Sequence, residues 1–173
     1  MMQAYLENDL KTFEWYLDTA GNETLTEYLT LAIDQQRVPF TEAILKRMPN
    51  DWNADDMVDA MVKGHAHHMV LSLIDYTSAE KHAGWLDIAI QNGDADLAAC
   101  LFEKLPNADA KGLSDQVYQS IRGADTRVGK LRHIAVFEVF YPHLSTEEIS
   151  AFYDQAVKDG ETDFVACLDR KTA

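Results

Sequence analysis

Apolar side chains recur along the chain with the spacing of amphipathic helices, and short polar breaks separate them. The pattern is clearest in residues 86–102. One apolar face has the i, i+3, i+4 spacing of a helix and consists of Leu86, Ala89 and Ile90. Asn92-Gly93-Asp94 then favours the end of this helix and the cap of a second one. The second apolar face consists of Leu97, Ala98, Leu101 and Phe102. The segment therefore predicts a helix-turn-helix hairpin.

The hairpin pattern repeats at nearly constant intervals. One small residue on the first apolar face of each copy serves as a reference residue, and these residues are Ala4, Ala32, Ala60, Ala89, Ser120 and Ala156. The first three intervals are 28, 28 and 29 residues, and the last two are 31 and 36. We therefore expect one all-α domain over residues 1–173, a solenoid of about six helix-turn-helix repeats, because each hairpin can bury both apolar faces only against its neighbours. No segment alternates with period two, so almost no strand is expected.

The longest interval indicates an insertion in the fifth turn, over residues 122–130, before a helix through Ile134, Phe137 and Phe140. Four basic residues fall in or just after this segment: Arg122, Arg127, Lys130 and Arg132. Two interpretations stay open. The cations belong to a surface loop and pair with nearby acids, or they contact a partner, since insertions in repeat proteins map to surface loops.

The connections between hairpins are short and polar, and three of them contain a proline, which cannot continue a helix. Ser145 and Glu148 have the spacing of a capping box and predict a helix that begins after Ser145. Trp52 lies in the connection 48–53, away from the helical apolar faces. It is either an exposed anchor for a partner or a residue that closes the gap between two hairpins.

The repeated pattern resembles the helical part of ankyrin repeats, most closely at Lys63-Gly64-His65 and Asn92-Gly93-Asp94. The Thr-Pro-Leu-His start of the ankyrin motif is missing, and intervals of 28 or 29 residues are shorter than the usual period of about 33. The β-hairpin fingers of that family are therefore expected to be short or absent. What the resemblance implies is a curved stack of helical hairpins that binds other proteins.

The net charge indicates which kind of protein is bound. There are 15 Lys and Arg residues against 29 Asp and Glu residues, so the formal net charge is −14. This charge repels nucleic acid and anionic lipid and accelerates encounters with a basic partner. We expect a protein-protein interaction module, an acidic inhibitor or immunity-type protein that binds a basic partner such as a nuclease or a nucleic-acid-binding protein. The alternative is a general ankyrin-like adaptor with no inhibitory role.

Partner-binding residues are expected at the connections before the first helices and on the concave face that those helices line. The candidates are Trp52, Asp55, Asp56, Arg122, Arg127, Lys130 and Arg132.

A further alternative is a metal-dependent enzyme that uses His65, His67 and His68, because imidazole binds zinc well. No HExxH or CxxC motif supports it. Cys100 and Cys167 each follow a reference residue by 11 positions, which favours small buried side chains over nucleophiles. Most paired carboxylates lie in turns or first helical turns, where they cap backbone N–H groups. We therefore expect no catalytic residue, no metal site and no cofactor.

Residues 1–9 lack the basic and apolar regions of a signal peptide, and no apolar run approaches the roughly 20 residues that cross a bilayer. Two cysteines 67 residues apart, without a CxxC motif, suit a reducing compartment. Together these features favour the cytoplasm.

Overall fold

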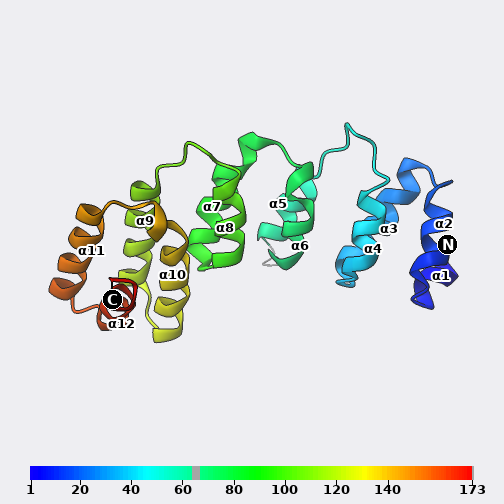
Figure 1. Cartoon of the computed structure of the whole chain (residues 1–173). Coiled ribbons are helices and arrows are strands. Elements are labelled where there is room, and N and C mark those ends of the chain that lie inside the picture. Colours follow the sequence, from blue (N-terminus) through cyan, green and yellow to red (C-terminus); the bar gives the residue numbers. More distant parts are fainter. Residues whose placement is uncertain (64–66, 173) are drawn as a thin grey trace. The chain divides into compact units, whose positions relative to one another are not determined.

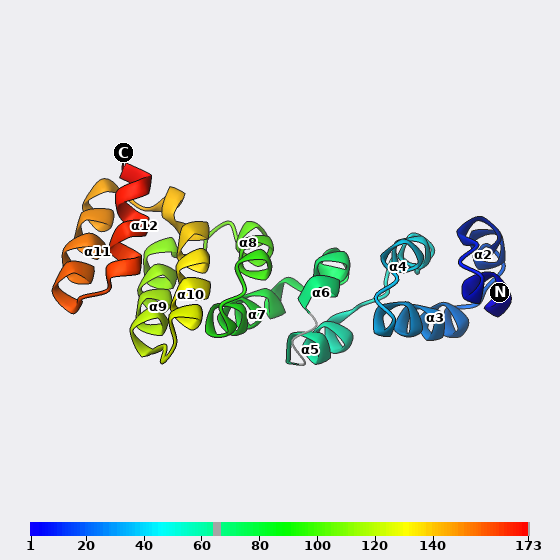
Figure 2. The same ribbon diagram turned by 90° about the horizontal axis from the view of Figure 1, so that it is seen from below.

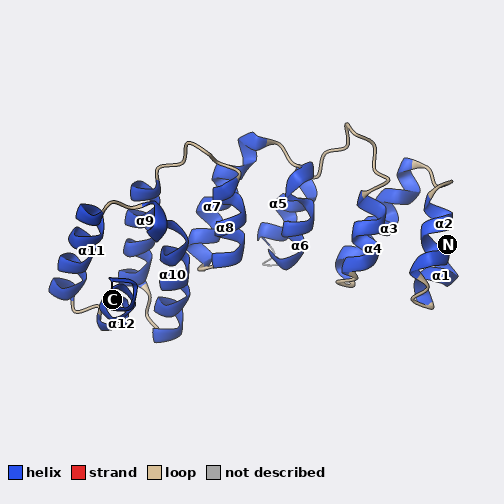
Figure 3. Ribbon diagram, in the orientation of Figure 1, coloured by secondary structure: helices blue, strands red, loops and turns tan. Residues whose placement is uncertain are grey.

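The computed structural model describes residues 1–63 and 67–172, and within them every regular element is a helix (Figure 3). The all-α class expected from the hydrophobic spacing is confirmed. The chain divides into two compact units, Met1–Thr77 and Ser78–Ala173, and each is described by itself. In both units the helices come in consecutive pairs, which we call the first and second helix of each hairpin (Figure 1).

The first unit contains three hairpins and a short 3-10 helix. Its elements are α1 (Met2–Leu6), α2 (Leu10–Leu17), α3 (Asn22–Asp34), α4 (Val38–Leu45), α5 (Asp55–Lys63), α6 (His67–Leu73) and η1 (Ile74–Tyr76). The two helices of each hairpin pack together, and the second helices also contact one another, α4 with α2 and with α6. Neighbouring hairpins are therefore joined mainly through their second helices.

An aromatic cluster holds the first two hairpins together. Tyr5, Phe13, Tyr28 and Phe40 surround one another with ring centroids 4.9–5.8 Å apart, mostly edge to face. The Arg37 guanidinium lies 4.3 Å from the centre of the Tyr5 ring and also donates to the Tyr5 carbonyl oxygen. Three buried rings and the half-buried Tyr28, with one cation beside them, stabilise this part of the chain.

The second unit also contains three hairpins. Its elements are α7 (Ala79–Asn92), α8 (Ala95–Glu103), α9 (Ala110–Gly123), α10 (Arg127–Phe140), η2 (Tyr141–His143), α11 (Thr146–Asp159) and α12 (Thr162–Thr172). The second helix α10 packs against both α8 and α12, while the first helix α9 contacts α7 (Figure 2). First helices thus form one layer of this unit and second helices the other.

A second aromatic cluster lies between the fifth and sixth hairpins. Tyr118, Phe137, Phe152 and Phe164 are buried, with ring centroids 4.7–6.0 Å apart. These four rings come from α9, α10, α11 and α12, so one cluster joins all four helices.

Four of the hairpin turns share one backbone motif at one repeat position. The residue four positions after the reference residue has a positive φ, and these residues are Asn8, Gln36, Gly93 and Gly160, with φ of 59°, 56°, 67° and 75°. The next backbone N–H donates to the carbonyl oxygen of the reference residue, as from Asp94 to Ala89 over 2.9 Å. The equivalent bonds onto Ala4, Ala32 and Ala156 are 2.7–2.9 Å long. This is the closure of a helix by a left-handed residue, so the repeat seen in the sequence is also a repeat of backbone geometry.

The fifth turn differs, and here the predicted insertion is only partly correct. Arg122 and Gly123 still belong to α9, and α10 already begins at Arg127, so the turn is only residues 124–126. Ala124 has an extended conformation, and the Thr126 side chain caps α10 by accepting from the Gly129 N–H over 3.1 Å. The extra length is helix instead of loop, because α10 has 14 residues where α8 has 9.

Two further predictions from the sequence can be compared with the structure: a capping box and the buried faces of the first helices. The capping box at Ser145 and Glu148 is confirmed, with both reciprocal hydrogen bonds present and α11 beginning at Thr146. Ala60 is exposed, whereas the other alanine reference residues are buried. In that hairpin the buried face of α5 consists of Val58, Met61 and Val62.

Candidate functional site

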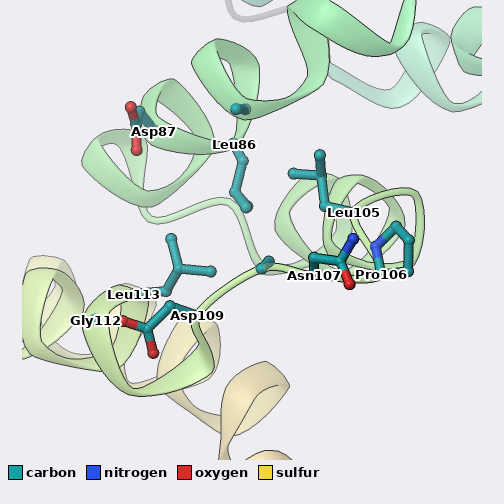
Figure 4. Close-up of a pocket in the computed structure, with 10 residues that line it drawn as sticks. Leu86, Asp87, Leu105, Pro106, Asn107, Asp109, Gly112 and Leu113 are labelled. Carbon is teal, nitrogen blue, oxygen red and sulfur yellow. The ribbon is translucent and has the colours of Figure 1, made fainter.

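The first helices α7 and α9 of the second unit leave a groove between them (Figure 4). Its volume is about 460 Å³, and the connection 105–109 forms one wall. Leu86 from α7 and Leu113 from α9 extend toward each other across the floor. Leu105 adds a third apolar side chain from the end of the preceding hairpin. The groove thus offers an apolar floor that is open to solvent.

Two carboxylates lie on the rim of this groove. Asp87 from α7 and Asp109 at the start of α9 both line it and are exposed, and its lining contains no Lys, Arg or His. Asp109 occupies the N-cap position of α9, but its side chain accepts no capping hydrogen bond. Asp87 accepts from Gln116 Nε2 over a long 3.5 Å. An apolar floor between two carboxylates favours a ligand that is both apolar and cationic.

Small residues on the facing helices explain why space remains here. Ala83 of α7 and Gly112 of α9 line the groove, and Ala108 lines its connecting wall. Large side chains at these positions would fill the gap that α7 and α9 leave between them. Pro106 shapes the same wall, because proline prevents the connection from continuing α8 as a helix.

Grooves between consecutive first helices occur elsewhere in the described chain. In the first unit, α3 and α5 enclose about 390 Å³ lined by Ile33, Met57 and Met61, with Asp34 on the rim. In the second unit, α9 and α11 enclose about 360 Å³ lined by charges of both signs. One of these pairs is closed within α9, since Lys111 donates to Asp115. Of these three grooves, the one between α7 and α9 combines an apolar floor with two carboxylates.

The predicted partner residues of the first unit lie at the start of α5. Trp52 is half-buried, and its ring packs against Tyr76 with the centroids 5.8 Å apart. The Ala54 N–H donates to the Tyr76 carbonyl over 2.9 Å, so the connection is fixed against η1. This packing favours the gap-closing interpretation of Trp52 over the exposed anchor.

The two acids that follow Trp52 occupy the first turn of α5. Asp55 is half-buried, and its backbone N–H donates to Asn53 Oδ1 over 2.7 Å. Asp56 is exposed. Carboxylates in a first helical turn interact favourably with the helix dipole, which gives both acids a structural role beside the predicted contact with a partner.

Three of the four predicted basic residues form ion pairs with acids at 159–163, where α11 ends and α12 begins. Arg122 Nε lies 3.1 Å from Asp159 Oδ2, and Lys130 Nζ lies 2.6 Å and 2.8 Å from the two Glu161 carboxylate oxygens. Arg127 makes two hydrogen bonds of 2.8 Å and 2.9 Å to Asp163. The pairing of these cations with nearby acids is thus confirmed. Their contact with a partner stays a prediction.

Arg132, the fourth basic residue, has a different environment. It is exposed, and its Cβ lies beside the turn at Gly93, where a Cβ built on that glycine would be only 2.8 Å away. Its side chain forms no ion pair in the described part of the chain, so its charge is available to a partner.

Hydrogen bonds change the acidity of several groups around these ion pairs. Gln155 and Tyr118 donate to Asp159 and lower the pKa of its carboxyl. The hydrogen bonds from Arg127 likewise lower the pKa of Asp163. Burial, with a further contribution from the bond to Asp159, raises the pKa of Tyr118. All three groups therefore keep the charge state at neutral pH that this hydrogen-bonded cluster requires.

The remaining reactive side chains have structural environments. Cys167 is buried, its thiol donates to Glu138 over 3.3 Å, and burial raises its pKa, as expected for an unreactive thiol. Cys100 is half-buried. His82 belongs to α7, where it is buried beside Trp85. Burial also lowers the pKa of His133.

The predicted histidine cluster falls largely outside the described residues, as His65 and the side chains of His67 and His68 are not among them. Among the residues that are described, no group of three or more His, Cys, Asp or Glu side chains is arranged to hold a metal ion.

Sequence reasoning predicted the connections and first-helix face as the binding region, and the groove lies there, but Leu86, Asp87, Asp109 and Leu113 were not among the candidates. The sequence signal that could have pointed to them is the pair of small residues Ala83 and Gly112, which line the groove from α7 and α9. No protein family, curated protein or solved structure matches this chain. In the described part of the chain, no helix has the length and apolar character needed to cross a bilayer.

Proposed function

We propose that this protein is a helical-repeat binding module whose partner is a basic protein, and that it acts as an acidic inhibitor of that partner. The observation that carries the proposal is the groove between α7 and α9, with its apolar floor, two rim carboxylates and no lining cation. Protein recognition surfaces combine an apolar centre with polar groups at the rim, as this groove does.

The ion pairs in the second unit strengthen the proposal. The basic segment is the main local departure from an acidic sequence, yet three of its four cations already pair with Asp159, Glu161 and Asp163. Positive charge is thus neutralised within the chain, while Asp87 and Asp109 remain exposed on a groove. A net charge of −14 then steers a basic partner toward the protein.

The repeat architecture that we propose is a stack of six degenerate hairpins similar to the helical part of ankyrin repeats. Its support is the shared left-handed turn four residues after four of the reference residues and the contacts between consecutive second helices within each unit. Stacked hairpins leave their first helices as a layer with grooves between them, which is a common arrangement of binding surfaces in repeat proteins.

The experiment that tests the function begins with the purified full chain as bait for its host proteins. The captured partner is then purified and titrated by calorimetry between 50 mM and 500 mM salt. Because electrostatic association is screened as the Debye length falls, we expect affinity to weaken by about tenfold or more over this range. Salt-insensitive binding would instead favour the general adaptor, and the basic-partner proposal would then be wrong.

Inhibition is tested separately on the same partner. If that partner is a nuclease, its cleavage of DNA should fall to zero at one equivalent of this protein, because the bound acidic chain excludes the nucleic acid. Full cleavage in a saturated complex would limit the role to binding.

A further inference from the structure

We infer that the groove between α7 and α9 receives one large apolar side chain from a basic segment of the partner, with flanking Lys or Arg residues pairing with Asp87 and Asp109. This inference rests on the proposed function and specifies the chemistry of the segment that is recognised. It concerns a single groove within the second unit (Figure 4).

The size of the groove favours an anchor side chain. A volume of about 460 Å³ lies in the lower half of the range for small-ligand pockets, and the groove is open instead of enclosed. Leu86 is buried, while Leu105 and Leu113 are half-buried, so each of the latter two keeps apolar surface exposed. Covering this surface with an apolar side chain gives about 25 cal/mol for each Å² removed from water.

The charges on the rim select what flanks the anchor. Asp87 comes from α7 and Asp109 from the start of α9, the two helices that bound the groove, so a segment that lies in the groove has a carboxylate near it on each helix. An acidic segment is repelled by both. A basic segment pairs with them, and charges at the edge of an interface fix register and exclude wrong partners.

The same charges argue against the other occupants of an apolar groove. A second copy of this chain brings another net charge of −14 and would be repelled at long range. An anionic small molecule finds no Lys, Arg or His in the lining. A basic segment with an apolar anchor therefore fits both the floor and the rim.

The test is a selection of random 12-residue peptides displayed on phage against the full-length protein, followed by titration of the enriched peptides by fluorescence anisotropy. We expect the enriched sequences to share a Leu, Ile, Met, Phe or Trp residue with Lys or Arg within about three positions on either side. Enrichment of acidic peptides, enrichment without an apolar anchor, or no enrichment would overturn the inference.

Two variants with matched controls locate the binding. Ala83→Phe fills the groove and should weaken peptide binding at least tenfold. Ala151→Phe makes the same change at an exposed position of α11 outside this groove and should leave affinity within twofold. Equal effects of the two changes would place binding elsewhere. Circular dichroism checks that both variants keep their helix content.

The contribution of the two carboxylates is tested with Asp87→Asn and Asp109→Asn. Each substitution is expected to weaken peptide binding about threefold or more. The Asp109 side chain accepts no capping hydrogen bond, so its replacement by Asn removes none from the start of α9. Asp154→Asn removes the same charge from an exposed site on α11 and should have little effect. Weakening by Asp154→Asn equal to that by Asp87→Asn would mean general steering without a specific contact, which contradicts the inference.

A failure of this inference can be told apart from a failure of the proposed function. A captured basic partner whose salt-sensitive binding survives both Ala83→Phe and Asp87→Asn would overturn the groove assignment and leave the function standing. Binding that is insensitive to salt would overturn the function. A dimer of this chain in sedimentation experiments that Ala83→Phe dissociates would replace the basic segment with a second copy.

Discussion

At the scale of single residues, different residue types adopt the same backbone conformation at one repeat position. This position lies four residues after the reference residue. Glycine occupies it at Gly93 and Gly160, where a positive φ costs little. Asn8 also occupies this position, and asparagine tolerates the left-handed region of φ and ψ well. Gln36 adopts the same left-handed conformation, although glutamine does not tolerate it as glycine and asparagine do. The turn at Gln36 therefore carries backbone strain that the other three turns avoid.

Gln36→Gly should therefore stabilise the first unit. Relief of about 1–2 kcal/mol of left-handed strain exceeds the added chain entropy of about 0.4–1 kcal/mol in the unfolded state, so a net gain of about 0.5–1 kcal/mol is expected. Urea unfolding of the full chain measures it. Asp34→Gly is the control, since Asp34 ends α3 as a helical residue and its replacement should lower stability.

Gly93→Ala should have the opposite effect on the second unit. An added Cβ meets a φ of 67° and would lie 2.8 Å from Arg132 Cβ, an atom that cannot move without its helix. We expect a loss of about 2 kcal/mol in thermal or urea unfolding.

Gly84→Ala gives the matched control for this change. Gly84 lies inside α7 with nothing within 4 Å of a built Cβ, so alanine should stabilise the helix by up to about 1 kcal/mol. Equal effects of the two substitutions would show that the turn motif has no special energetic role.

In the sequence, glycine occupies this repeat position at Gly64, Gly93 and Gly160, whereas the first two hairpins have Asn8 and Gln36 there. The geometry persists there because the hydrogen bond onto the reference carbonyl is a backbone feature that side chains influence but do not make. Periodicity therefore predicted the turns well. It could not predict that Gln36 would adopt a glycine-like conformation, since glutamine has no local preference for a positive φ.

At the scale of secondary-structure elements, three ion pairs join the end of α9 and the start of α10 to the acids at 159–163, where α11 ends and α12 begins. They differ in burial. In the Arg127–Asp163 pair the arginine side chain is 75% exposed, whereas the Lys130 and Glu161 side chains are 29% and 12% exposed. The pair of Lys130 and Glu161 should contribute most to holding the sixth hairpin, because Glu161 would otherwise be a largely buried, unpaired charge.

Lys130→Met should therefore destabilise the sixth hairpin by about 1–2 kcal/mol, the typical cost of a polar group left unsatisfied. Native-state hydrogen exchange measures the change hairpin by hairpin, and the loss of protection is expected in α11 and α12, with α8 little affected. Arg132→Met removes a neighbouring cation that forms no ion pair in the described chain and should change little. Unchanged protection of α12 in Lys130→Met would contradict the proposed role of the pair.

The pair of Arg127 and Asp163 predicts a pH effect. The folded-state pKa of Asp163 lies below its ordinary value, so its stabilising contribution is complete above that value and is lost as the pH falls through the folded pKa, below about pH 4. Arg127→Gln should raise the pKa of Asp163 toward the ordinary value, measured by NMR titration of its carboxyl group. Arg132→Gln should leave that pKa unchanged, and a similar rise in both variants would reject the pairing as its cause.

The sequence could not distinguish a loop at 122–130 from an extension of two helices. Glycine, aspartate and threonine in this segment are typical of loops, but Gly123 ends one helix and Gly129 lies in the first turn of the next. The deciding feature is long-range, since the cations that would be dispersed in a solvated loop are aligned on helices opposite the acids at 159–163.

At the scale of the whole molecule, the excess of acids is spread over both units. In each of the two units, residues 1–77 and 78–173, Asp and Glu outnumber Lys and Arg. The internal ion pairs of the second unit neutralise part of its small positive charge. Net self-repulsion of the folded chain is the consequence.

Raising the salt concentration from 10 mM to 300 mM should therefore stabilise the protein, although it weakens the ion pairs. We expect a gain of about 1 kcal/mol, corresponding to roughly 2–4 °C in the melting temperature. Differential scanning calorimetry measures it, with sucrose as a control for effects unrelated to charge. A melting temperature that falls with salt would mean that the ion pairs outweigh the general repulsion.

The left-handed turns also bear on how quickly the chain reaches its fold. Each of these four turns is closed by a hydrogen bond between residues only five apart, and each joins two helices that are adjacent in sequence. Contacts this local close with little loss of chain entropy and favour rapid nucleation. The fifth hairpin lacks the motif and needs acids more than 30 residues away to align its helices. Refolding should thus begin in the glycine-closed hairpin at Gly93, and the pairing of the fifth and sixth hairpins should follow as a later kinetic step.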